Sequence, residues 1–113
     1  MKYTVLTVKE IDYKLRLDAK ASVELEKKLG KNPLNIFISI ANNSELPKLT
    51  DVIQVLHASM LSLQHGISLD DVYSIYDDYI DEGHTMVDLI PVLLDVFKAS
   101  GFFKDEGTEP KNA

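Results

Sequence analysis

The sequence predicts a mainly α-helical protein with an N-terminal β-hairpin followed by about five helices in one compact domain, which is α+β by strict count. Residues 2–17 alternate apolar and polar side chains with the two-residue period of strands, whereas residues 18–101 space their apolar side chains three and four apart, as helices do. The chain has 113 residues, of which 45% are hydrophobic, and this suits a single core. We therefore expect one domain over residues 1–103 and a flexible C-terminal tail over residues 104–113.

Two short segments are expected to pair as an antiparallel hairpin. Residues 2–9 and 13–17 both alternate like strands, and only Glu10, Ile11 and Asp12 separate them. Neither Gly nor Asn marks the turn, but a three-residue connection is long enough for a hairpin. Because two strands alone are marginally stable, the apolar face of the hairpin should pack against helices.

Capping signals define the first two helices. Asp18 is the expected N-cap of the first helix, and Gly30 is its expected end. Asn32 and Pro33 suit the cap and the first turn of a second helix, which should run to about Ala41. The residues expected on the inward faces are Ala21, Leu25 and Leu29 in the first helix, and Leu34, Phe37, Ile38 and Ala41 in the second.

Three further helices are expected after a loop over residues 42–48. Thr50 should cap the first of them, and residues 68–71 and 85–88 have the S/T-x-x-D spacing of a capping box. Pro91 fits the first turn if the last helix begins at Asp88, but it would kink a helix that begins at Thr85. The expected ends are Gly66, Gly83 and Gly101. The expected inward faces are Ile53, Leu56, Met60 and Leu61; then Leu69, Val72, Tyr76, Tyr79 and Ile80; then Ile90, Leu93, Leu94 and Phe97.

Charge divides the chain into two parts. Residues 1–34 carry eight Lys or Arg against five Asp or Glu, while residues 49–97 carry nine acids and no Lys or Arg, within a net charge of −6. Such an acidic block repels a phosphate backbone, so no nucleic-acid partner is expected. It suits either simple solubility or a basic protein partner.

The sequence has no feature of a membrane or secreted protein. No run approaches the roughly 18 to 20 uninterrupted apolar residues of a membrane span, and the N-terminus lacks the order of a signal peptide. The chain has no cysteine, which excludes disulfides, thiolate zinc sites and thiol nucleophiles. We expect a cytoplasmic protein without a membrane partner.

Acidic and aromatic side chains are concentrated in residues 73–84, YSIYDDYIDEGH. On a helix, Asp77, Asp78, Asp81 and Glu82 fall on the side away from the inward-facing tyrosines. We therefore expect these four acids to face solvent. They are candidates for partner binding, and the alternative is a merely solvated face.

Metal, cofactor and catalytic sites are not expected. With Gly83 at the sixth position of a calcium loop, apolar residues would occupy ligand positions. His84 and the neighbouring acids would need ligands from another helix, and His57 and His65 have no acid three or four residues away to orient the imidazole. Because Gly-rich phosphate loops and the G-x-S-x-G motif are also absent, the sequence predicts a protein that is not an enzyme.

Two segments resemble the tail assembly chaperone family of long-tailed (siphovirus-type) phages and prophages. Residues 13–37, YKLRLDAKASVELEKKLGKNPLNIF, are similar to its strand-then-helix signature: a strand ending in L-R-L, a helix bearing L-E-x-x-L-G, and a proline-started helix. Residues 88–103, DLIPVLLDVFKASGFF, resemble its last helix, which ends in a glycine and an aromatic or aliphatic pair.

The resemblance implies a non-enzymatic role in virion morphogenesis. The chain would bind the long, helical tape measure protein in the host bacterial cytosol until the tail polymerises, with the tail tube subunit as a further candidate partner. Asp77, Asp78, Asp81 and Glu82 would steer a basic segment toward a groove between helices. The resemblance also implies a longer, frameshifted product, and residues 110–113, PKNA, are compatible with a slippery codon run, as are residues 30–32.

Two other classes of function stay open. A generic small helical adaptor or regulatory protein-binding module in a bacterial cytosolic complex would have the same fold and the same acidic face. A metal-dependent hydrolase would require His65 or His84 to meet a carboxylate on another helix. The sequence also leaves open the oligomeric state, including a homo-oligomer, and the partner segment that is bound.

Overall fold

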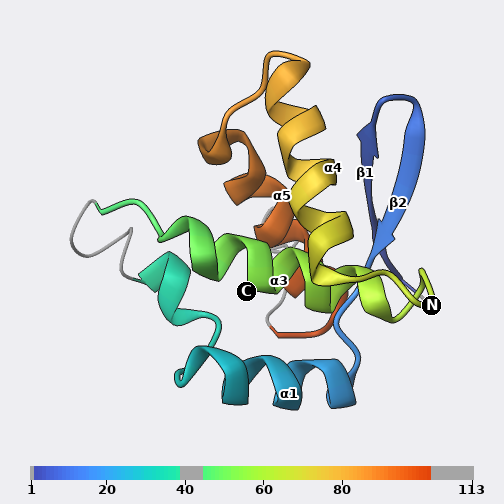
Figure 1. The fold of residues 1–113 in the computed structure, drawn as a ribbon. Helices are drawn as coiled ribbons and strands as arrows, with labels where there is room; N and C mark the ends of the chain where they lie inside the picture. The colour runs from blue at the N-terminus through green and yellow to red at the C-terminus, as the bar shows by residue number, and fades with distance from the viewer. Residues whose placement is uncertain (1, 39–44, 103–113) are drawn as a thin grey trace, which may run out of the picture.

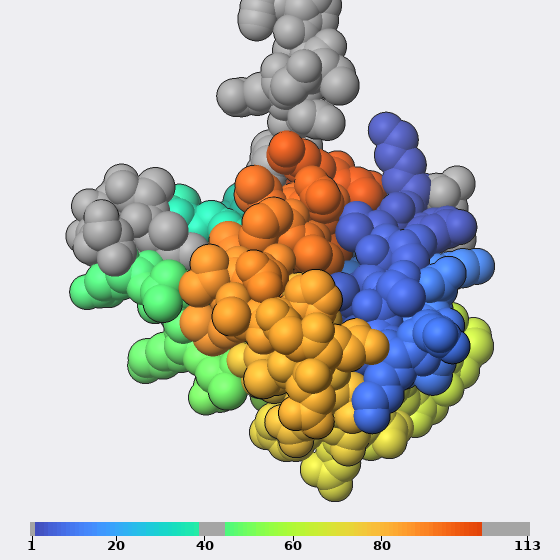
Figure 2. Space-filling model, turned by 90° about the horizontal axis from the view of Figure 1, so that it is seen from above, coloured from blue at the N-terminus to red at the C-terminus, as the bar shows by residue number. Residues whose placement is uncertain are grey.

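The chain begins with a two-stranded antiparallel sheet, as predicted. The computed structural model describes residues 2–38 and 45–102, in which β1 spans Thr4–Val8 and β2 spans Ile11–Leu15. The register places Leu6 opposite Tyr13 and Val8 opposite Ile11. Seen from above, the blue atoms of the hairpin lie directly against the gold and orange atoms of the helices that follow residue 68 (Figure 2).

The turn differs from the predicted three-residue connection. Lys9 and Glu10 alone join the strands, and their φ angles are 50° and 67°. Positive φ at both residues of a two-residue loop is typical of a type I′ turn, whose twist matches that of the strands. The prediction was wrong because Asn and Gly usually mark this turn, and neither is present. Ile11 and Asp12 therefore belong to β2.

Helices form most of the remaining described chain, which confirms the predicted mainly α-helical fold. They are α1 (Ala19–Leu29), a short segment at residues 35–38, α3 (Leu49–Leu61), α4 (Leu69–Asp81) and α5 (Met86–Ala99). In Figure 1, α1 runs below α3, while α4 stands beside the hairpin. The predicted helix end at Ala41, much of the 42–48 loop, and the tail and domain limit after residue 102 lie outside the described residues.

The helix caps follow the local sequence closely except at α3, which ends at Leu61 with Ser62 as its C-cap, so the predicted end at Gly66 is wrong. The Asp18 carboxylate accepts a hydrogen bond from the backbone N–H of Ala21, and Gly30 ends α1 in the left-handed conformation. Both predicted capping boxes are present, at residues 68–71 and 85–88. Thr50 is not a cap, because α3 begins one residue earlier. The N-caps of α1, α3, α4 and α5 are Asp18, Lys48, Ser68 and Thr85.

Pro91 lies inside α5 rather than in its first turn. The helix is capped by Thr85 and begins at Met86, so the alternative start at Asp88 is wrong. Proline has no N–H, and the i→i−4 hydrogen bond to the carbonyl of Val87 cannot form. Pro91 is exposed, so the Val87 carbonyl that lacks this hydrogen bond lies on the solvent-facing side of α5.

One apolar core joins the hairpin to the helices. At its centre, the ring of Phe97 contacts Phe37 edge to face, with 5.4 Å between centroids, and Phe102, with 5.0 Å between centroids. The buried apolar residues are Leu6, Val8, Leu15, Leu17, Leu25, Ile36, Val52, Ile53, Val55, Leu56, Met60, Val72, Ile75, Tyr79, Leu89, Leu93, Val96 and Phe97. Two predicted inward residues, Ile38 and Leu61, are instead exposed. No helix in the described ranges is long and apolar enough to cross a membrane.

Candidate protein-binding site

The four acids predicted as partner contacts differ in their surroundings. Asp77 and Asp81 are exposed on α4, whereas Asp78 is partly buried and Glu82, just past the helix end, has an intramolecular partner. Asp77, Asp81 and Glu82 are exposed, as predicted, whereas Asp78 is only partly exposed, and both Asp78 and Glu82 contact the hairpin turn. Sequence spacing placed the four together on one side of α4, but it could not show that the hairpin turn lies against part of that side.

Asp78 and Glu82 both contact Lys9, in the hairpin turn. The Lys9 Nζ lies 3.3 Å from the Asp78 carboxylate, and the backbone N–H of Lys9 donates to Glu82 Oε2 at 2.8 Å. Because left-handed backbone costs a residue other than glycine roughly 1–2 kcal/mol, the turn needs compensating contacts. The two acids supply such contacts, and this assigns them a structural role.

Asp77 and Asp81 belong to a different row of α4. Asp70, Tyr73, Asp77 and Asp81 follow one another at spacings of three and four, which places them on one face of the helix. All four are exposed, and the Tyr73 ring keeps about half of its surface in contact with solvent, at 49%. We call these four residues the α4 outer stripe. It presents three carboxylates and one aromatic ring to solvent.

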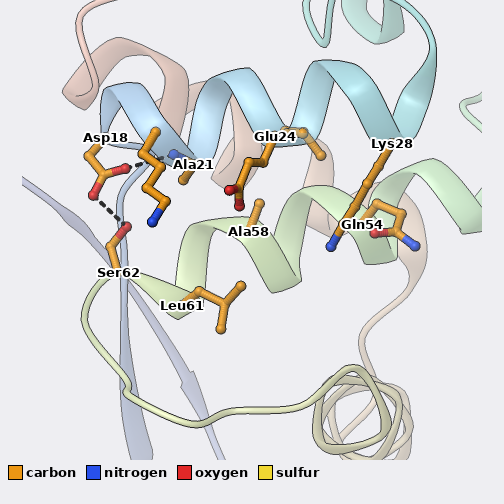
Figure 3. Close-up of a pocket in the computed structure, with 10 residues that line it drawn as sticks. Asp18, Ala21, Glu24, Lys28, Gln54, Ala58, Leu61 and Ser62 are labelled. Carbon is orange, nitrogen blue, oxygen red and sulfur yellow. Dashed lines mark hydrogen bonds between the residues drawn. The ribbon is translucent and has the colours of Figure 1, made fainter.

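A groove lies between α1 and α3, on a different part of the surface. It has a volume of about 240 Å³ and is open to solvent. From α1 it is lined by Lys20, Ala21, Glu24, Leu25 and Lys28, and from α3 by Gln54, Ala58, Leu61 and Ser62. Figure 3 shows Glu24 and Lys28 extending from α1 toward α3, with Ala58 on the facing helix between them. We call this feature the α1/α3 groove.

Asp18 closes one end of the α1/α3 groove. One of its carboxylate oxygens accepts the N–H of Ala21 at 2.8 Å, and the other accepts the hydroxyl of Ser62 at 3.3 Å (Figure 3). The same side chain therefore caps α1 and links it to the C-terminal end of α3. This hydrogen bond joins the two walls at one end of the groove.

Sequence reasoning did not find the α1/α3 groove. Its two walls are far apart in the sequence, and no spacing rule predicts that α1 packs beside α3. The available signal was small: Ala21 and Ala58 are small residues on the helix faces that meet, and Leu61 is an apolar residue left exposed. None of the four predicted acids lines the groove.

His57 and His84 have local structural partners. His57 Nε2 lies 3.0 Å from the carbonyl oxygen of Ile67. The His84 ring stacks on Tyr79, with 4.3 Å between centroids, and its Nδ1 lies 3.7 Å from the Asp88 carboxylate. Within residues 2–38 and 45–102, no three His, Cys, Asp or Glu side chains gather as metal ligands would.

The perturbed titrating groups have explanations in packing and capping. Hydrogen bonds from the backbone and hydroxyl of Ser68 lower the pKa of the Asp71 carboxyl. Burial, reinforced by nearby carboxylates, raises the pKa of the phenols of Tyr13, Tyr76 and Tyr79. None of these groups lines the α1/α3 groove. What the groove offers to a binding partner is its shape, apolar contact and the charges of the side chains that line it.

The chain was compared with known proteins and families. No curated protein and no solved structure matches it. The model of DUF6096, a family of unknown function, matches residues 1–112. Because this match spans nearly the whole sequence, the chain belongs to the DUF6096 family.

Proposed function

We propose that the chain is a non-catalytic, protein-binding module that acts as a phage tail assembly chaperone. It holds the tape measure protein in the host bacterial cytosol until the tail polymerises, with the tail tube subunit as a further partner. The observation that carries the proposal is the α1/α3 groove, a preformed, partly apolar channel between two helices. The resemblance of residues 13–37 and 88–103 to the chaperone family supplies the identity of the partner.

The groove suits a helical partner. Two helices that lie side by side leave a channel parallel to their axes, and an amphipathic helix can place its apolar face there. Leu61 offers apolar contact and Leu25 lies buried beneath the groove, while Ala21 and Ala58 leave room for a backbone to approach. A tape measure protein, which the resemblance implies is long and helical, presents many such segments.

The α4 outer stripe is proposed to assist by steering. Residues 49–97 contain no Lys or Arg, so the field around α4 is negative and attracts a basic segment from a distance. Charges of this kind change the rate of association more than the final affinity. Asp77 and Asp81 remain candidates for this role, whereas Asp78 and Glu82 are occupied by the hairpin turn.

The test is co-expression with the tape measure protein encoded near the gene, followed by co-purification. Leu61→Lys places a charge in the groove, and Val23→Lys is its matched control, because Val23 is exposed on α1 but does not line the groove. We expect the wild type and Val23→Lys to retain the partner and Leu61→Lys to lose it. Thermal unfolding of each variant checks that it remains folded.

Two results would contradict the proposal. Failure of the folded wild type to retain the tape measure protein would reject that partner and favour the alternative of a generic helical adaptor. Retention of the partner by Leu61→Lys would reject the groove as the contact surface. A third variant, Asp77→Lys with Asp81→Lys, should slow association without abolishing it, and rate measurements at low salt would detect this.

A further inference from the structure

We infer that the α1/α3 groove selects a helix whose rim carries acid, base and acid at four-residue intervals. This inference deepens the proposed function, because it rests on the groove being the partner-binding site. It concerns the chemistry of the bound segment, which neither the fold nor the family match specifies.

The inference starts from a row of charges on α1. Lys20, Glu24 and Lys28 succeed one another at four-residue spacing, and all three are exposed and line the groove. Side chains at this spacing lie above one another on one helix face. Across residues 2–38 and 45–102, none of the three forms an ion pair. The α1 wall of the groove therefore presents a positive, a negative and a positive charge in succession along the helix.

The other wall has no matching charges. Gln54, Ala58 and Leu61 of α3 are uncharged, and the one acid at the end of the groove, Asp18, is engaged with Ser62 and the N-terminus of α1. A bound helix therefore meets an uncharged surface on the α3 side and alternating charge on the α1 side. This asymmetry sets how the partner helix must be rotated about its own axis.

A helix running along the groove would have the same rise per residue as α1, about 1.5 Å, so charges four residues apart on the two helices stay in step. Opposite charges at matched positions attract, and like charges at those positions repel. The complementary row is acid, base, acid. Because this row reads the same in both directions, the charges allow either orientation of the bound helix.

A second copy of the chain does not supply this row. In a two-fold arrangement of two α1 helices, Glu24 would face Glu24 and Lys20 would face Lys28, which sets like charges opposite each other. None of the helices in the described part of the chain carries acid, base and acid at successive four-residue steps. A helix of a different protein is therefore the occupant that we propose.

A uniformly basic helix does not fit either. It would complement Glu24 but would set like charges against Lys20 and Lys28. Attraction of basic segments thus belongs to the α4 outer stripe, while the groove reads an alternating pattern. The two surfaces have separable roles, and the inference can be tested apart from the identity of the partner.

The test uses two synthetic helical peptides with the same apolar face. One carries Glu, Lys and Glu on its rim at four-residue intervals, and the other carries Lys, Glu and Lys. Compensating residues on the far face give both peptides the same net charge, because the overall charge of −6 would otherwise bias the comparison. Binding is measured by fluorescence anisotropy at low and high salt.

Three exposed ion pairs lead us to expect that the wild type binds the Glu-Lys-Glu peptide about tenfold more tightly, with a preference that shrinks at high salt. The variant Lys20→Glu, Glu24→Lys, Lys28→Glu should prefer the other peptide. The matched control is Glu26→Lys with Lys27→Glu, an exposed, charge-neutral exchange on α1 that does not line the groove. It should keep the wild-type preference.

Equal binding of both peptides, binding of neither, or a preference that the triple exchange does not reverse would overturn the inference. Failure of the inference and failure of the proposed function give different results. Reversal of peptide preference without retention of the tape measure protein would reject that partner and leave the groove chemistry standing. Retention of the tape measure protein by a folded triple-exchange variant at wild-type affinity would reject the charge pattern and leave the partner standing.

Discussion

At the scale of single residues, Lys9 and Glu10 are the only non-glycine residues with positive φ in the described ranges. Their conformation is held from outside the hairpin, because Asp78 pairs with the Lys9 ammonium group and Glu82 accepts the Lys9 backbone N–H. The acids at these two positions are thus explained by the stability of the turn.

The first prediction distinguishes an acid that contacts the hairpin turn from an acid that is exposed without such a contact. Glu82→Ala removes the acceptor of the Lys9 N–H and should lower the free energy of unfolding by about 1 kcal/mol. Asp81→Ala changes an exposed acid one position away and should have an effect within about 0.5 kcal/mol. Urea unfolding of both variants measures the difference. Equal effects would mean that the Glu82 contact does not stabilise the turn.

The second prediction concerns the turn itself. Glu10 has a φ of 67°, a conformation that glycine adopts without steric cost. Glu10→Gly should therefore stabilise the protein by about 0.5 kcal/mol, after the greater flexibility of glycine in the unfolded chain is subtracted. Glu24→Gly, in the middle of α1, should destabilise by about 1 kcal/mol. Opposite signs for the two glycines in thermal unfolding would confirm the left-handed turn, and a loss of stability in both would refute it.

At the scale of elements, the two capping boxes were predictable because each depends on residues only three positions apart. In α4, the Ser68 hydroxyl accepts the N–H of Asp71, and the Asp71 carboxylate accepts the N–H of Ser68. The inward face of α4 was less predictable. Ile75 and Tyr76 are adjacent, and the spacing favoured Tyr76, which does pack against the core, but Ile75 is the more deeply buried of the two. Side-chain periodicity cannot choose between neighbours when both are apolar.

The third prediction is a pH dependence that originates in the α4 capping box. Hydrogen bonds from Ser68 lower the pKa of Asp71 in the folded state, so the ionised carboxylate stabilises the fold above the unfolded pKa of about 3.9. That contribution is lost as the pH falls through the lowered folded pKa. Asp71→Asn should therefore reduce stability most above about pH 5, with a difference from the wild type that shrinks toward about pH 3. A difference that stays constant with pH would contradict the assignment.

At the scale of the whole molecule, a few polar contacts tie the hairpin to the helical layer. The Gln64 amide accepts the N–H of Lys14 at 2.7 Å and donates to the carbonyl of Lys14 at 2.9 Å, as a neighbouring strand would. It also donates to the Met60 carbonyl at 2.7 Å, near the end of α3. The Arg16 N–H donates to Ser59. The contacts of Gln64 with Lys14 and of Arg16 with Ser59 join residues more than 40 positions apart and do not follow from local spacing. This is why the sequence predicted the elements but not how they pack.

The fourth prediction follows from the role of Gln64. Gln64→Leu leaves the backbone N–H and carbonyl of Lys14 without their hydrogen-bond partner and should lower the free energy of unfolding by about 1–3 kcal/mol. His65→Leu, the same substitution at the exposed neighbour, should have an effect within about 0.5 kcal/mol. Hydrogen exchange should also show faster exchange of the Lys14 amide in Gln64→Leu alone. An unchanged exchange rate of the Lys14 amide would show that Gln64 does not protect the edge of β2.

At this scale we propose two surfaces for protein binding, the α1/α3 groove and the α4 outer stripe, and we propose that the groove holds the partner. Because the chain has no cysteine, a single cysteine can carry a photo-crosslinker at a chosen site. The most direct measurement attaches it either at Ala58→Cys in the groove or at Asp77→Cys in the outer stripe, in the presence of the tape measure protein. We predict efficient crosslinking from Ala58→Cys to one helical segment and weak, salt-sensitive crosslinking from Asp77→Cys. Strong crosslinking from Asp77→Cys with none from Ala58→Cys would contradict the account.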